Sequence, residues 1–283
     1  MSNTGPESSV PPAPAGGGEA GLRPAGAAAG QGREKPLVGR APAVLNWRAA
    51  AFVALAVAVG IYYGTHEWWF ELPLWWDIAW LCFLLIPAVF GLVYLALPLW
   101  RTPTLWLFLA ALSFIALAVV LQATGAEPVA NFAKLAAMTA IGWCFLHFFE
   151  EVSWVVLVSV IVPWVDSYSV WRGPTKTIVT EKPEVFSALS FTFPVPGQEG
   201  GAKLGMPDLL FFALFLGASA RFELRPFWTW LCLTASLGGT MALATVWDVN
   251  GLPALPLLCL GFLLPNADLL WRAVRPKLSR RSG

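Results

Sequence analysis

Eight long runs of apolar residues constrain the fold of this chain more than any other feature of its sequence. They cover roughly residues 49–65, 75–99, 104–123, 131–148, 152–170, 206–222, 226–247 and 252–271. A helix needs about 20 apolar residues to cross the hydrocarbon core of a bilayer. The chain is 57% hydrophobic and 12% charged, whereas an ordinary soluble domain carries about 25% charged residues. We therefore predict an all-α fold, a polytopic membrane helix bundle with about eight transmembrane helices.

The other segments divide the chain into a membrane domain and two tails. Residues 1–46 are rich in Gly, Ala and Pro and lack the bulky apolar residues that stabilise an ordered core, so we expect a disordered tail. Residues 47–272 form the predicted multi-span domain, and residues 273–283 form a basic C-terminal tail. Both tails carry Lys and Arg beside apolar spans, which is typical of topology determinants. We therefore expect cytoplasmic termini, a multi-pass protein of the cell membrane, and no nucleic-acid partner.

Residues 171–205 form a long polar loop between the fifth and sixth apolar runs. Loops of this length in compact proteins are usually functional or disordered. Two stretches within it, Thr175–Thr180 and Ser187–Phe193, contain residues that favour β-strands. We therefore predict short strands in this loop.

Asp166 is the leading candidate for chemistry, because it has apolar residues on both sides within the fifth run. A charge inside a membrane span is costly, and an intramembrane carboxylate is a functional candidate by default. The alternative is a carboxylate near a helix end that is solvated or paired with Arg172.

Asp208 is the second candidate and stands at the start of the sixth run, directly after Pro207. Pro and Asp also suit the first turn of any helix, where the macrodipole favours an anion. A structural role for Asp208 is therefore an open alternative.

The third element is the segment Gly251-Leu-Pro-Ala-Leu-Pro256 at the start of the last run. Its two prolines resist helix formation and favour an extended backbone. Alone, such a segment is a common way to begin a membrane span.

Together these elements resemble the presenilin and signal-peptide-peptidase family of intramembrane aspartyl proteases. That family has a Tyr-Asp motif in one span, Gly-x-Gly-Asp in the next, and Pro-Ala-Leu at the start of its last span. The matching positions here are Asp166, then Gly205 to Asp208, then Pro253, Ala254 and Leu255. The residues that follow the two aspartates, as far as Pro174 and Gly217, are also similar to the family.

The resemblance extends from about Val158 to Leu270, roughly the C-terminal 40% of the chain. Two positions depart from the family pattern. Val165 stands where the family has Tyr, although Tyr168 is nearby, and Pro207 stands where it has the second Gly. Proline forbids backbone conformations that glycine permits.

The resemblance implies a presenilin-like core and an endopeptidase that cleaves transmembrane peptide substrates or remnant signal peptides in the lipid bilayer. Asp166 and Asp208 would share one proton, the ionised carboxylate activating water and the protonated one polarising the scissile carbonyl. Pro253, Ala254 and Leu255 would bind an extended substrate strand, as in β-augmentation, and a strand of the 171–205 loop could add to it. No metal or organic cofactor is implied.

Two alternatives from other functional classes fit the same residues. A proton- or cation-coupled transporter or channel would also use acids at broken helices near the membrane midplane. A catalytically silent presenilin-like protein would bind membrane helices without cleaving them. Other membrane proteases fit less well, because His66 and His147 do not form an HExxH zinc motif and no His follows Ser219. Prepilin peptidases lack the Pro-Ala-Leu element.

The remaining acids and cysteines receive structural interpretations. Glu150, Glu151 and Asp248 belong to span ends or turns, and we expect Asp268 to pair with Arg272 by helical spacing. All four cysteines lie in apolar segments without a CxxC pair, so we expect small buried side chains rather than disulfides or a zinc site.

Overall fold

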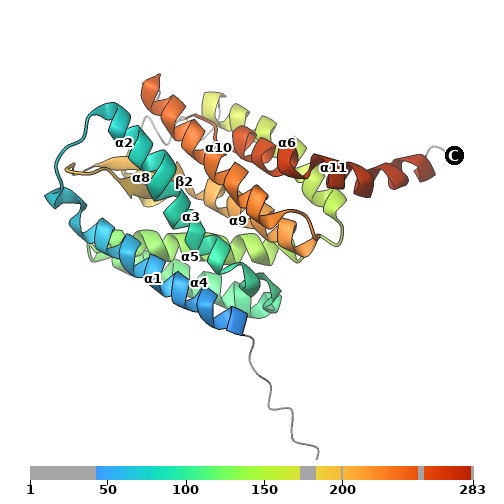
Figure 1. Cartoon of the computed structure of the whole chain (residues 1–283), viewed down its shortest axis with the longest axis horizontal. Helices are drawn as coiled ribbons and strands as arrows, with labels where there is room; N and C mark the ends of the chain where they lie inside the picture. Colours follow the sequence, from blue (N-terminus) through green and yellow to red (C-terminus); the bar gives the residue numbers. More distant parts are fainter. Residues whose placement is uncertain (1–42, 173–182, 199, 248–251, 282–283) are drawn as a thin grey trace, which may run out of the picture. The chain divides into compact units, whose positions relative to one another are not determined.

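The computed structural model describes residues 43–172, 183–198, 200–247 and 252–281, most of which are helical (Figure 1). Seven helical segments among these residues are long and apolar enough to cross a membrane: Trp47–Trp68, Leu74–Leu95, Thr104–Ala123, Glu127–Leu146, Val152–Val170, Pro226–Val246 and Leu255–Val274. The prediction of an all-α, polytopic membrane helix bundle is confirmed. Most of the predicted N-terminal tail, residues 1–42, lies outside the described residues.

The long helices are α1 (Ala43–Thr65), α4 (Thr104–Ala123), α5 (Glu127–Leu146), α6 (Val152–Arg172), α10 (Pro226–Val246) and α11 (Leu255–Arg281). The second span is composite, because α2 (Leu74–Trp80), a π-helical turn η2 (Leu81–Leu85) and α3 (Ile86–Leu95) follow one another. Short 3₁₀ turns η1 (His66–Trp68) and η3 (Leu97–Arg101) follow α1 and α3. Helix α11 continues to Arg281, so residues 273–281, expected as part of a tail, extend the last helix.

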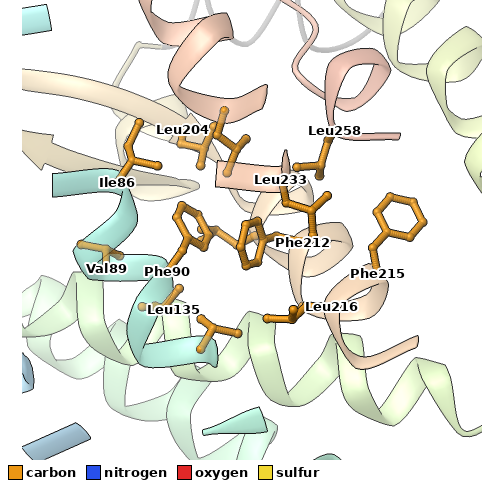
Figure 2. Close-up of a cluster of buried hydrophobic side chains, with 14 of the residues drawn as sticks. Ile86, Val89, Phe90, Leu135, Leu204, Phe212, Phe215, Leu216, Leu233 and Leu258 are labelled. Atoms are coloured by element: carbon orange, nitrogen blue, oxygen red, sulfur yellow. The ribbon is translucent and has the colours of Figure 1, made fainter. Parts of the chain in front are cut away.

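The sixth predicted span is helix α9 (Met206–Arg221), which has only 16 residues. At 1.5 Å per residue it is roughly 24 Å long, shorter than the hydrocarbon core of about 30 Å. It lies between α5 and α10 and also contacts α11 (Figure 1). Eight consecutive residues of α9, from Phe212 to Ser219, are buried. The ring of Phe212 packs on that of Phe90 of α3 (Figure 2), with 4.1 Å between the ring centroids. Helix α9 is therefore the centre of the bundle.

Small residues allow α9 to approach α5 closely. A Cβ atom added at Gly142 of α5 would lie 2.6 Å from the carbonyl oxygen of Leu210, and one at Gly217 of α9 would lie 2.8 Å from Trp143 Cδ1. Helices in lipid associate through such close packing, because lipid tails are as apolar as the side chains. The α5–α9 crossing thus fixes the position of the helix that carries Asp208.

A β-hairpin leads directly into α9. Its strands are β1 (Ser190–Pro194) and β2 (Gly201–Gly205), which pair antiparallel with Thr192 opposite Lys203, and the short helix α8 (Pro183–Ala188) precedes them. Strand β1 overlaps the β-prone stretch Ser187–Phe193, whereas β2 was not predicted. The other predicted stretch, Thr175–Thr180, lies outside the described residues.

The turn of the hairpin packs against the loop that joins α1 to α2. The N–H of Gly197 donates to the carbonyl of His66 at 2.8 Å, and Gly197 has a φ of +72°. A Cβ atom there would lie 2.7 Å from the backbone nitrogen of Glu71. Glycine is thus required at this position both for its conformation and for its small size.

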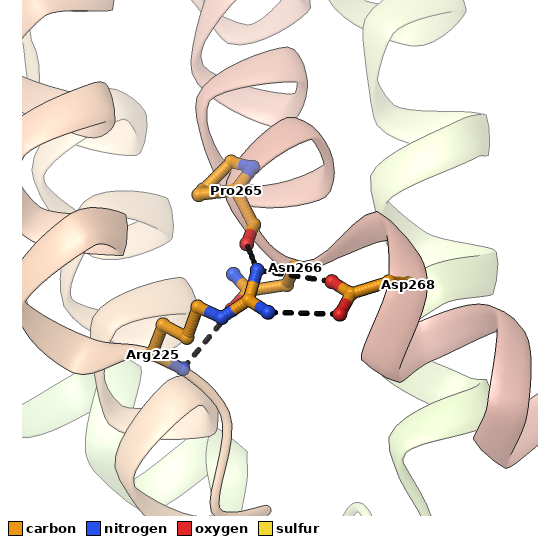
Figure 3. Close-up of polar contacts among 4 residues, drawn as sticks. All are labelled: Arg225, Pro265, Asn266 and Asp268. Carbon is orange, nitrogen blue, oxygen red and sulfur yellow. Dashed lines mark hydrogen bonds and ion pairs between the residues drawn. The ribbon is translucent and has the colours of Figure 1, made fainter.

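Polar contacts join the start of α10 to α11 (Figure 3). The buried side chain of Asn266 donates to Thr229 at 2.8 Å and accepts from the backbone N–H of Arg225. The guanidinium of Arg225 forms a bidentate pair with Asp268, with distances of 3.0 and 2.8 Å. Asp268 therefore pairs with Arg225 of another helix rather than with Arg272, because tertiary packing brings that guanidinium closer.

Candidate active site

Asp166 lies on α6, three residues after Pro163, which is inside the helix. Its carboxylate is partly buried and accepts a hydrogen bond of 3.2 Å from the backbone N–H of Leu255. Leu255 is the first residue of α11, and the first N–H groups of a helix have no partner within it. Asp166 thus caps the start of α11, and the bond joins the first candidate acid to the Pro-Ala-Leu segment.

The Pro-Ala-Leu segment has the backbone that its prolines favour. Residues 252–254 are not helical, and α11 begins at Leu255, with Pro256 in its first turn. Proline is tolerated there because the first turn needs no N–H donors. Ala254 and Leu255 are both buried, so the segment is fixed within the protein. Gly251 lies outside the described residues.

Asp208 is the third residue of α9, and Gly205 is its N-cap. The carboxylate accepts a hydrogen bond from the backbone of Gly205, as acidic side chains at this position commonly do. A Cβ atom at Gly205 would lie 3.2 Å from Asp208 Oδ2, so glycine leaves the space that this carboxylate occupies. Asp208 therefore has, at the start of α9, the structural role that the sequence left open.

Pro207, which replaces the family's second glycine, lies in the first turn of α9. Proline has a φ suited to this turn and lacks only an N–H that would have no helical partner. Gly205, the capping residue, has an extended backbone with φ −64° and ψ 145°. The substitution is therefore compatible with the local backbone at Asp208.

The two aspartates converge from different helices. Asp166 and Asp208 are close enough for direct electrostatic interaction, and Asp166 also interacts electrostatically with the buried Cys259 of α11. Helix α6 packs mainly against α11 and touches α9. The structure therefore brings Asp166, Asp208 and the Pro-Ala-Leu segment into one neighbourhood.

Neither of the two residues at or near the position of the family's tyrosine is buried. Tyr168 is 67% exposed and Val165 is 61% exposed. On a membrane helix such surfaces meet lipid. Tyr168 therefore does not substitute for the tyrosine of the family motif in this arrangement.

Sequence reasoning missed two polar residues on α5. Asn131 and Lys134 are both buried in the fourth apolar run, and both bond to strand β1. The rule that selected Asp166, a charge inside a span, applies equally to Lys134. The signal was therefore present in the sequence.

A scan against protein-family models and a search of curated proteins give no match for this chain. The functional argument therefore depends on the motifs and on the geometry of the site.

Proposed function

We propose that this protein is an intramembrane aspartyl protease of the presenilin and signal-peptide-peptidase type, with Asp166 and Asp208 as its catalytic pair. The main support is the hydrogen bond from Leu255 to Asp166, together with the proximity of Asp208. A proton or cation pathway needs acids inside the membrane, but it does not need the Pro-Ala-Leu backbone beside them. The protease needs all three elements together.

The proposed reaction is the addition of water to a peptide bond. The ionised carboxylate removes a proton from water, and the resulting hydroxide attacks the scissile carbonyl carbon. The protonated carboxyl group donates to the carbonyl oxygen and stabilises its developing charge. When the C–N bond breaks, the amine nitrogen takes a proton from the pair, which returns to its singly protonated state.

The substrate would be a transmembrane segment or a remnant signal peptide that unwinds before cleavage. A membrane helix keeps its amides bonded internally, so an extended substrate needs new backbone partners. Thr192 directs its N–H and C=O away from the hairpin, to Asn131 and Tyr63. Its partner Lys203 therefore directs its own backbone groups to the opposite edge, since facing residues of such a pair point apart. This edge of β2 leads to Asp208 and is the proposed place for substrate addition.

The chain is a multi-pass membrane protein by its seven apolar helices. We place it in the cell membrane with both termini in the cytoplasm. This orientation is supported by the basic residues near both ends and by counting α9 as an eighth crossing element.

The test is cleavage of a synthetic transmembrane peptide by the protein reconstituted in liposomes. Asp166→Asn and Asp208→Asn should each reduce cleavage to the background rate, because each removes one carboxylate of the pair. Asp268→Asn is the matched control, since Asp268 pairs with Arg225, and it should cleave normally. Full activity in either of the first two variants would exclude the proposed mechanism.

A further inference from the structure

Lys134 is a buried lysine in the middle of a membrane helix. It lies on α5 and is 5% exposed, although a lysine in a span is costly unless its ammonium group is satisfied. Its Nζ donates to the carbonyl oxygen of Ser190 at 3.2 Å. Two charged side chains interact electrostatically with the Lys134 ammonium group: Glu127, two turns earlier on α5, and Lys203 on β2. The lysine is thus aimed at the first residue of strand β1.

Three further side chains bond to the same edge of β1. Asn131 Oδ1 accepts from the N–H of Thr192 at 3.4 Å, and the Tyr63 hydroxyl donates to the carbonyl of Thr192 at 3.0 Å. The Tyr62 hydroxyl donates to the carbonyl of Pro194 at 2.9 Å. With Lys134, these side chains of α1 and α5 form what we call the edge clamp, defined as Tyr62, Tyr63, Asn131 and Lys134.

The clamp closes an edge that would otherwise be open. The outer edge of a strand presents unpaired backbone groups that can bind another strand. On β1 these outward groups belong to Ser190, Thr192 and Pro194, and each accepts or donates a bond within the clamp. An extended peptide can therefore add to the hairpin only at β2.

A continuous series of contacts leads from Lys134 to Asp208. Lys134 bonds to Ser190, which lies opposite Gly205 in the register of the hairpin. Gly205 is the N-cap of α9 and bonds to the Asp208 carboxylate. The N–H of Met206, the first residue of α9, also donates to the carbonyl of Leu189 beside Ser190. A shift of β1 along α5 would thus move the start of α9.

We propose that Lys134, with the rest of the edge clamp, is a positioning residue that fixes the register of the hairpin against α5 and so fixes the cleavage position. This inference rests on the proposed function for its catalytic consequence. The clamp itself is a structural device that can be measured without activity.

The first test compares Lys134→Met with Lys134→Arg in the full-length protein. Met keeps much of the length of the side chain but has no donor, whereas Arg keeps a charged donor. We expect Lys134→Met to lower cleavage about tenfold, the effect of one lost hydrogen bond to a charged group, and to spread the products over neighbouring peptide bonds. Lys134→Arg should retain the single cleavage position of the wild type. Thr139→Val, which removes another buried polar group of α5, is the control and should leave the product pattern unchanged.

The second test is hydrogen exchange of the backbone amides from Ser190 to Phe193, measured by mass spectrometry in detergent. We expect about tenfold faster exchange in Lys134→Met than in the wild type or in Thr139→Val. If the wild type cleaves no peptide, the proposed function fails while this measurement still decides the clamp. If Lys134→Met does not fold, Tyr63→Phe removes one clamp hydroxyl and serves in both tests. Unchanged exchange together with an unchanged product pattern would overturn the proposal.

Discussion

The two helices that carry the candidate aspartates differ in how they are held. Helix α9 is surrounded by α5, α10 and α11 and is preceded by a clamped hairpin. Helix α6 packs mainly on α11 and has few buried residues, and its exposed side chains include Trp154, Leu157, Val160, Ile161 and Trp164. One acid therefore has a fixed position, whereas the other is carried by a helix with few neighbours. Asp208 is therefore held by several helices, whereas Asp166 is held mainly through α11, including its bond to Leu255.

The largest difference should appear in stability. Phe212→Ala on α9 removes a fully buried ring that packs on Phe90, and we expect it to lower the free energy of unfolding by about 3–5 kcal/mol. Trp164→Ala on α6 removes a ring that is 77% exposed, and we expect a change within about 0.5 kcal/mol. Thermal unfolding in one detergent would measure both. Similar losses in the two variants would contradict the comparison.

Crowding at the α5–α9 crossing should have the next largest effect. Gly142→Leu would force a side chain against the Leu210 carbonyl, and overpacking of this kind costs about 1–3 kcal/mol. The matched control is Gly60→Leu on α1, where an added Cβ atom meets nothing within 4 Å. Thermal unfolding should separate the two, and an equal shift in both would show that the crossing is not tight.

Crowding of the Asp208 carboxylate should affect cleavage more than folding. In Gly205→Ala the added Cβ atom lies 3.2 Å from Asp208 Oδ2, so the carboxylate must shift. We expect Gly205→Ala to cleave about tenfold more slowly, which corresponds to a loss of about 1.4 kcal/mol in transition-state stabilisation. Gly200→Ala, in an open part of the hairpin loop, should retain its rate. Peptide cleavage measures both variants, and an unchanged rate in Gly205→Ala would argue against a catalytic role for Asp208 in this position.

The smallest effect on stability should come from loss of the ion pair between Arg225 and Asp268, which joins the start of α10 to α11. Arg225 and Asp268 are both about half exposed, and exposed pairs contribute about 0–1 kcal/mol. Asp268→Asn should therefore lower the unfolding temperature slightly, and added salt should reduce the difference. A large loss would show that the pair is essential to the contact between α10 and α11.

Elements defined by their own residues could be predicted from the sequence, whereas elements held by distant contacts could not. Seven of the eight predicted spans correspond to described helices that are long and apolar enough to cross a membrane, because each is defined by its own apolar residues, whereas the sixth is the short helix α9. Strand β2 was missed because Gly-Ala-Lys-Leu-Gly has little intrinsic preference for a strand. It becomes a strand through pairing with β1, which is in turn held by side chains more than fifty residues away in sequence.

The candidate site was predicted to a similar extent. Asp166, Asp208 and the Pro-Ala-Leu segment were identified by their order along the chain, and the structure brings them together. Partners from distant elements were not predictable in this way. Asp268 was assigned to Arg272 because both lie on one helix, whereas its partner Arg225 is the residue that precedes the adjacent helix α10. Spacing along one helix cannot predict an ion pair with a residue that is distant in sequence.

The shortness of α9 has a consequence for water. Its 16 residues are shorter than a full crossing of about 30 Å requires, so for α9 to contribute to a crossing, the extended backbone of the preceding hairpin would have to lie at membrane depth. Such backbone is tolerated at membrane depth only inside protein or beside a water-filled space. The hydrolysis that we propose would need water at Asp208 without an opening in the bilayer. Under the proposed function, we expect water to reach the site at the start of α9, where helix gives way to strand beside Asp208.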